Sequence, residues 1–137
     1  MKYVLDSSVA LKWVLPEADS QKAIRLRDDF NLQINELLAP DVFPVEVAHA
    51  LSRSERRGII QPQEGMQKFA DVLRTLPQLY PSLPLLPRAY LLSSQFRIGV
   101  YDCLYAVLAE QEQCQAVSAD VRLASLFPQV VLLSSLP

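Results

Sequence analysis

Residues 2–11 read KYVLDSSVAL, and this stretch decides the fold. The apolar residues Tyr3–Leu5 predict a short buried strand, and Asp6 follows directly, with a helix start behind it. An aspartate there is typical of a helix N-cap, because its carboxylate accepts hydrogen bonds from free backbone N–H groups. The ends of parallel strands are also where α/β proteins place their sites. The remaining sequence must decide between these two interpretations.

The composition is that of one globular domain spanning residues 1–137. Half of the residues are hydrophobic and the net charge is −2, so binding to nucleic acid would need a local basic patch. No apolar run approaches the length of a membrane span, and no signal-peptide pattern opens the chain, so we expect a cytoplasmic protein without membrane contact. A single histidine, His49, and two cysteines without zinc spacing exclude a Cys/His zinc site.

Strands and helices are expected to alternate along the chain. Three more short apolar runs predict strands, at Glu36–Ala39, Gln115–Ser118 and Val130–Leu133. Amphipathic stretches predict helices at 7–15, 18–30, 41–58 (capped by Asp41), 62–76, 87–96, 101–113 and 120–127, and the proline-rich segment 76–87 is expected to be an extended connection. This order predicts a three-layer α/β/α fold with a mainly parallel central sheet.

Four acidic residues fall at boundaries between these elements. Asp6 and Asp120 follow predicted strands, whereas Glu46 and Asp102 lie in the first turns of predicted helices. Since strand ends and the following helix starts share one edge of a parallel sheet, we expect the four carboxylates to converge there.

The neighbours of two of these acids indicate partial burial. Asp102 shares a helical face with Ala106 and Ala109, and Glu46 lies beside an apolar stripe. Carboxylates that are buried together repel one another, and a hard divalent cation such as Mg²⁺ or Mn²⁺ would relieve that repulsion. The structural alternative is that Asp6 and Asp120 are helix caps and that the other two acids are charges favoured by the helix dipole.

Four segments that contain these acids resemble, in order, the four acidic motifs of the PIN domain. They are LDSSVALKWV (5–14), APDVFPVEVAHAL (39–51), VYDCLYAVLAE (100–110) and VSADVRLASL (117–126). The resemblance covers essentially the whole chain and is nearest to the VapC-type toxins of bacterial toxin–antitoxin pairs. It implies a PIN-like fold and Mg²⁺- or Mn²⁺-dependent hydrolysis of RNA phosphodiester bonds. It also implies a homodimer and a cognate antitoxin as partner.

The resemblance also assigns residue roles. Asp6, Glu46, Asp102 and Asp120 match the acidic quartet that would bind metal and carry catalysis. Ser7 or Ser8 matches the small hydroxyl residue after the first acid, and Ser118 matches the hydroxyl residue two before the last. Such hydroxyls commonly orient a carboxylate or a metal-bound water, although Ser8 is equally suited to capping the helix. Cys103 stands where alanine is commoner.

The densest basic segment is SRSERRG (52–58), with Arg53, Arg56 and Arg57. These arginines are candidates for contact with RNA phosphates or with antitoxin carboxylates. They are equally explained as the solvated end of a helix, where the dipole favours cations. The amphipathic helices expected at 18–30 and 62–76 are candidate dimer or partner surfaces.

Three other classes were compared with this interpretation. A phosphoacceptor receiver domain needs a lysine after a late strand, and no lysine follows Lys68. A haloacid-dehalogenase-type phosphatase needs an aspartate two residues after the first, where this chain has Ser8. A non-enzymatic PIN-like protein that binds RNA or protein remains the alternative, and a metal-dependent nuclease assay separates it from the enzyme. His49 is expected to be a surface or structural residue.

Overall fold

The central feature of the fold is a five-stranded, fully parallel sheet with the order β3-β2-β1-β4-β5. The computed structural model describes all 137 residues. The strands are β1 (Lys2–Leu5), β2 (Glu36–Pro40), β3 (Gln78–Tyr80), β4 (Gln115–Ser118) and β5 (Val130–Leu132). In the middle of the sheet, Val4 pairs with Leu38 on one side and with Ala116 on the other. The predicted three-layer α/β/α architecture with a parallel sheet is confirmed.

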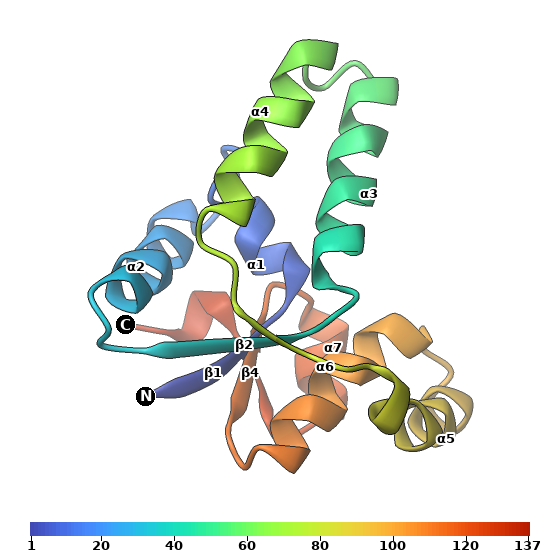
Figure 1. Ribbon diagram of the computed structural model, residues 1–137. Helices are drawn as coiled ribbons and strands as arrows, with labels where there is room; N and C mark the ends of the chain where they lie inside the picture. The colour runs from blue at the N-terminus through green and yellow to red at the C-terminus, as the bar shows by residue number, and fades with distance from the viewer.

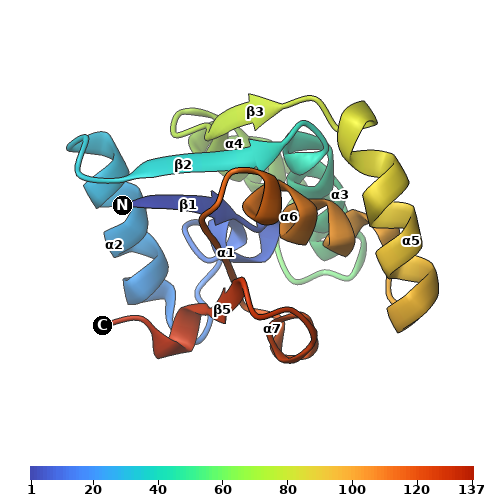
Figure 2. The ribbon, with the colours of Figure 1, turned by 90° about the horizontal axis from the view of Figure 1, so that it is seen from below.

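Helices cover both faces of the sheet. They are α1 (Ser7–Leu11), α2 (Ser20–Asn31), α3 (Phe43–Arg56), α4 (Pro62–Leu73), α5 (Leu86–Phe96), α6 (Val100–Gln111) and α7 (Val121–Leu126), with short 3₁₀ turns η1 (Leu83–Leu85) and η2 (Leu133–Ser135). Helices α1, α3 and α4 lie on one face and α6 on the other, with α5 packed on α6 (Figures 1 and 2). The α3–α4 hairpin projects away from the sheet (Figure 1). None of the helices combines the length and apolar character needed to cross a bilayer.

Helix α6 is the buried centre of the second layer. It contacts β1, β2 and β4 on one side and α5 on the other, so Cys103–Ala109 are all buried. A continuous apolar run is what a helix packed on two sides requires. Asp102 stands immediately before this run, in the first turn of α6, and is therefore half-buried against the core.

The strand order reverses direction between β1 and β4. The chain leaves β1 toward the face that carries α1. Because crossovers between parallel strands are almost always right-handed, the connection from β4 to β5 through α7 is expected to run over the opposite face. The two connections therefore diverge and leave a crevice at the carboxyl ends of β1 and β4. The backbone N–H of Asp6 donates to Val117 O at 3.1 Å, which holds the two strand ends together at that point.

The segment 76–87 differs from its prediction, because it contains strand β3 and turn η1 rather than only an extended connection. Strand β3 has three residues at the edge of the sheet and stands between Pro77 and Pro81. An edge strand tolerates neighbouring prolines because one of its sides needs no ladder hydrogen bonds, so the prolines hide the strand signal without preventing the strand.

Two local predictions about helix starts and ends are wrong. Asp41 does not cap α3, whose N-cap position is Val42; the Asp41 carboxylate accepts hydrogen bonds from the backbone N–H and the hydroxyl of Ser82. The first helix ends at Leu11 rather than continuing to residue 15. The chain turns there, and the Trp13 indole N–H donates to Ala23 O at 2.9 Å, which fixes the turn against α2.

The two helices expected to offer docking surfaces differ in exposure. On α2, Ala23 and Leu26 are buried in the chain's own core, so little of its apolar stripe is free. On α4, Met66 is 70% exposed and Leu73 is 38% exposed. Only the α4 stripe therefore leaves apolar surface for another chain.

Candidate active site

Asp6 is a buried carboxylate held by two serines. It follows β1 at the N-cap position of α1, yet its side chain makes no capping hydrogen bond. The hydroxyls of Ser8 and Ser118 instead both donate to its Oδ2, each at 2.7 Å. The capping alternative is therefore wrong for Asp6, and Ser8 orients a carboxylate rather than capping α1. The Asp6 carboxylate is therefore oriented by one residue of α1, Ser8, and by the last residue of β4, Ser118.

Asp120 is a helix cap and a member of the acidic group at the same time. Its Oδ1 accepts hydrogen bonds from the backbone N–H groups of Arg122 at 2.9 Å and Leu123 at 3.2 Å. Its own N–H donates to Ser118 Oγ at 3.0 Å. Ser118 thus links the backbone of Asp120 to the carboxylate of Asp6. The expectation that Asp120 caps a helix is confirmed.

Glu46 reaches the site from the first turn of α3 and is held there by a tyrosine. The phenol hydroxyl of Tyr105 donates to Glu46 Oε1 at 2.6 Å. Sequence reasoning missed Tyr105, although its position three residues after Asp102 places both side chains on the same face of α6. That spacing was the available signal, but only the folded chain, in which the Glu46 side chain of α3 reaches α6 from the other side of the sheet, shows which acid Tyr105 binds.

The structure brings the four acids close enough to influence one another electrostatically. Burial raises the pKa of the Asp6 carboxyl, raises that of Glu46 to about 7 and raises that of Asp102 to about 6. Repulsion from neighbouring carboxylates adds to each of these pKa shifts, with Asp6 acting on both Glu46 and Asp102. Burial is the largest cause of these raised pKa values, whereas the sequence had led us to expect repulsion between the carboxylates. Among basic side chains, Arg122 opposes the rise at Asp102.

The donor set suits a hard divalent cation, but the acids do not form a closed cage. No three histidine, cysteine or carboxylate side chains stand at the mutual spacing of a complete metal site. Glu46 is held by Tyr105, and Asp120 is engaged by the start of α7. Oxygen ligands that carry uncompensated negative charge are nevertheless what Mg²⁺ binds, and Mg²⁺ commonly keeps several waters between itself and protein groups. The residues therefore fit a partly hydrated ion.

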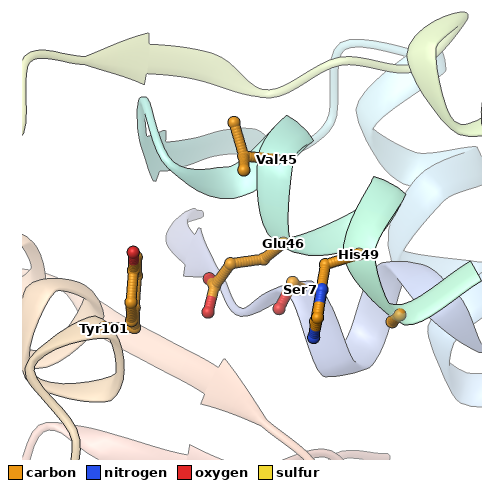
Figure 3. A pocket seen from close by; sticks show the side chains of 6 residues that line it. Ser7, Val45, Glu46, His49 and Tyr101 are labelled. Carbon is orange, nitrogen blue, oxygen red and sulfur yellow. The ribbon is translucent and has the colours of Figure 1, made fainter. Parts of the chain in front are cut away.

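Two hollows flank the acids. The larger, about 490 Å³, is lined by Ser7, Val45, Glu46, His49, Ala50 and Tyr101 (Figure 3). The smaller, about 100 Å³, is lined by Ile98, Gly99, Asp102, Asp120, Arg122 and Leu123. Ser7 thus lies in the wall beside Glu46. His49 is exposed, as expected, but it lines the same hollow, a placement that sequence reasoning missed together with Tyr101.

The basic segment does not reach the acids. Arg53 and Arg56 lie in the last turn of α3 and Arg57 follows it, at the opposite end from Glu46. Seven residues or more of helix, on the order of 10 Å or more, separate them from that acid. All three are exposed, and Arg56 Nη1 donates to Ser52 Oγ at 2.7 Å. They are available to a partner but are not part of the acidic centre.

Fold and site together define a class of protein: a doubly wound α/β domain with a group of carboxylates in the crevice at its switch point. The family model named PIN domain matches residues 3–126, and the chain belongs to this family. The resemblance found in the four sequence motifs is thereby confirmed.

Curated relatives align over most of their length. The chain is 30% identical over 133 residues to "Ribonuclease VapC3" of Pyrobaculum aerophilum, covering 96% of this chain and 98% of the relative. It is 32% identical over 122 residues to "Ribonuclease VapC12" of Mycobacterium tuberculosis, covering 88% of each.

Solved structures show the same fold at lower identity. A crystal structure of a Pyrobaculum aerophilum protein matches with a TM-score of 0.75 and 19% identity, covering 98% of this chain and 85% of that one. VapBC2 from Rickettsia felis, solved bound to a DNA fragment from its promoter, matches with a TM-score of 0.66 and 16% identity, covering 96% and 97%.

Proposed function

We propose that this protein is a VapC-type ribonuclease that hydrolyses RNA phosphodiester bonds with Mg²⁺ or Mn²⁺ and acts as the toxin of a toxin–antitoxin module. The observation that carries the proposal is the group of four carboxylates at the sheet's switch point, where burial and neighbouring negative charge raise the pKa of Asp6, Glu46 and Asp102. Membership of the PIN family and the ribonuclease names of its relatives support it. Dependence on divalent metal is general among PIN-domain ribonucleases.

The four acidic residues are the proposed ligands of the cation. Asp6, Asp102 and Asp120 bind the ion, and Glu46 joins them directly or through water. A bound Mg²⁺ or Mn²⁺ lowers the pKa of a coordinated water and offsets charge on the reacting phosphate. Ser8 and Ser118 keep the Asp6 carboxylate in one orientation, and Tyr105 does the same for Glu46. Side chains fixed in this way lose little freedom when a ligand binds.

The proposed partners are an RNA substrate, a cognate antitoxin and a second copy of the chain. The solved structures with a similar fold include VapBC2 and a structure of FitAB bound to a DNA fragment, which matches with a TM-score of 0.59 and 14% identity, and this likeness supports an antitoxin partner. The exposed stripe of α4, with Met66 and Leu73, is the candidate surface for the homodimer. Arg53, Arg56 and Arg57 are the candidate contacts to RNA or to an acidic antitoxin segment. A cytoplasmic location is proposed with them, because RNA substrates of this kind are found there.

The test compares the wild type, Asp102→Asn and Asp28→Asn on total cellular RNA. Asp28 is an exposed acid on α2, far from the crevice in the fold, and serves as the matched control. We expect cleavage with Mn²⁺ by the wild type and by the control, loss with EDTA, and a decrease of roughly two orders of magnitude in Asp102→Asn. Equal cleavage by all three proteins would identify a contaminating nuclease, and the non-enzymatic alternative would then take precedence.

A further inference from the structure

The larger hollow beside the acids is lined by aromatic, aliphatic and imidazole side chains as well as by one carboxylate. Its volume of about 490 Å³ lies within the range of ligand pockets. Tyr101 is 58% exposed and Val45 is 67% exposed, although both stand next to carboxylates. The Tyr101 ring, from α6, stands across the gap from Glu46 and His49 of α3 (Figure 3). The exposed Tyr101 ring offers an aromatic face to this gap, and the Glu46 carboxylate, Val45 and the His49 imidazole make up the rest of the wall shown (Figure 3). An exposed aromatic face of this kind is suited to stacking a flat group.

The position of the hollow relates it to the acids. Tyr101 directly precedes Asp102 in α6, and Glu46 is itself part of the wall. If a flat group rests on the Tyr101 ring, the atoms bonded to that group lie close to the carboxylates. In an RNA strand, each phosphate is joined to ribose units, and each ribose carries a nucleobase. Aromatic and histidine side chains are the usual platforms for unpaired RNA bases.

We infer that this hollow is a nucleobase subsite, in which an unpaired base stacks on Tyr101 while the neighbouring phosphate lies at the acids. The inference rests on the proposed ribonuclease function. It adds that the enzyme binds one unpaired base of its RNA substrate in this hollow. Stacking tolerates any base because every base has a flat face. The subsite therefore selects unpaired nucleotides rather than a sequence, because a base inside a duplex cannot enter the hollow.

A basic side chain of a protein partner is the competing occupant, and the lining argues against it. The larger hollow carries one acid, Glu46, whose Oε1 is already bound to Tyr105. The smaller hollow carries two acids, Asp102 and Asp120, but Arg122 also lines it and already supplies a positive charge there. The apolar and aromatic wall thus favours the neutral base over the charged side chain.

The experiment measures kcat/KM on a short single-stranded RNA that spans a cleavage site mapped beforehand, and on the same RNA with abasic ribose on either side of that site. We expect Tyr101→Ala to lower kcat/KM for the intact RNA by roughly tenfold or more, the scale of one lost base stack, and Tyr101→Phe to stay within about twofold of the wild type. Tyr90→Ala is the matched control, because Tyr90 is an exposed tyrosine on α5 outside the hollow. On one of the abasic RNAs, the wild type and Tyr101→Ala should become equal.

A binding measurement separates this inference from the proposed function. Fluorescence anisotropy with the labelled RNA compares Asp102→Asn with Asp102→Asn/Tyr101→Ala, so neither cleavage nor a bound metal ion is needed. We expect the double variant to bind the intact RNA roughly tenfold more weakly and the abasic RNA equally. If the wild type cleaves no RNA, the ribonuclease proposal fails, while anisotropy still decides whether the hollow binds a base.

Two results would overturn the subsite. One is equal cleavage and equal RNA binding with and without the Tyr101 ring. The other is unchanged RNA binding together with weaker binding of a labelled arginine-containing peptide, which would assign the hollow to a protein partner.

Discussion

Tyr105 and Glu46 lie 59 positions apart in the chain, and a 2.6 Å hydrogen bond joins the phenol of one to the carboxylate of the other. This bond counteracts part of the effect of burial on the Glu46 pKa, which is nonetheless raised to about 7. The acid contributed by α3 is therefore kept partly ionised near neutral pH by the helix that also carries Asp102.

Replacing Tyr105 with phenylalanine should raise the pKa of Glu46 further, because its ionised form loses a hydrogen bond. We expect the Mn²⁺ concentration for half-maximal cleavage to rise more at pH 6.5 than at pH 8.5. Tyr80→Phe is the matched control, because the Tyr80 hydroxyl donates to Glu112 at 3.2 Å outside the site. A parallel increase at both pH values would mean that Tyr105 acts on the shape of the site and not on the ionisation of Glu46.

The metal-free protein should lose stability as pH rises. The pKa of Asp102 is raised to about 6 and that of Glu46 to about 7 in the folded state, so the folded protein holds protons that the unfolded chain releases. This contribution is fully present below about pH 4 and is lost as pH rises through 6 to 7. Urea unfolding in EDTA at pH 5 and pH 8 measures it.

In the same unfolding experiment, Asp102→Asn should show a smaller difference between the two pH values. We expect the difference to shrink by about 1 kcal/mol, less than the full pKa shift would give, because the site is partly open to solvent. If Asp102→Asn leaves the difference in unfolding free energy between pH 5 and pH 8 unchanged, the pKa of Asp102 is not raised in the folded protein.

Divalent metal should reverse this loss of stability. An ion that binds only the folded protein at a hundredfold excess over its Kd adds about 2.7 kcal/mol, or roughly 5–15 °C in Tm for a chain of this size. We expect Mn²⁺ to produce such an increase in the wild type and in Asp28→Asn, and little in Asp102→Asn. Asp102→Asn should also melt above the wild type in EDTA, since one repelling charge is gone. Calorimetry with and without Mn²⁺ checks both expectations, and equal Mn²⁺ shifts in all three proteins would place the ion elsewhere.

Ser118→Ala should destabilise the fold by about 1–3 kcal/mol, because the buried Asp6 carboxylate loses a 2.7 Å hydrogen bond. The hydroxyl stabilises the ionised form of Asp6, since it lowers that group's pKa, so the loss should be larger at pH 8 than at pH 5. Ser125→Ala removes only an exposed hydroxyl that bonds within α7 and should have little effect. Urea midpoints at the two pH values test this. Equal losses at both pH values would show that Ser118 acts through packing and its bond from the Asp120 N–H, and not through the charge of Asp6.

Strand positions and the place of the acids could be predicted from the sequence because both are local signals. Strand β4 has its predicted bounds, and β1 and β2 differ from theirs by one residue at one end. Asp6 and Asp120 could be placed at one sheet edge because both follow apolar runs in a parallel fold. These conclusions needed only periodicity, strand ends and the rule that parallel strands share an edge.

The remaining parts of the site depend on contacts between distant segments. Neither the bond from Tyr105 to Glu46 nor the hollow between Tyr101 and His49 can be read from spacing along one helix, because the fold must first bring side chains of α3 and α6 together. The sequence left open whether Asp120 caps a helix or belongs to the acidic group, but these roles do not exclude each other. Asp120 caps α7, and its charge also contributes to the raised pKa of Asp102. Strand β3 was missed because three residues between prolines carry too short a pattern to be recognised.

The bond from Ser118 to Asp6 joins residues 112 positions apart, the first near the end of the chain and the second near its beginning. During synthesis, β1 leaves the ribosome long before its neighbour β4 exists, so at first Asp6 has Ser8 but lacks Ser118, Asp102 and Asp120. An incomplete chain therefore has no acidic centre to bind metal. For an enzyme that cleaves RNA, this order of assembly withholds activity from every nascent chain still attached to the ribosome that is making it, until almost the whole domain has been translated.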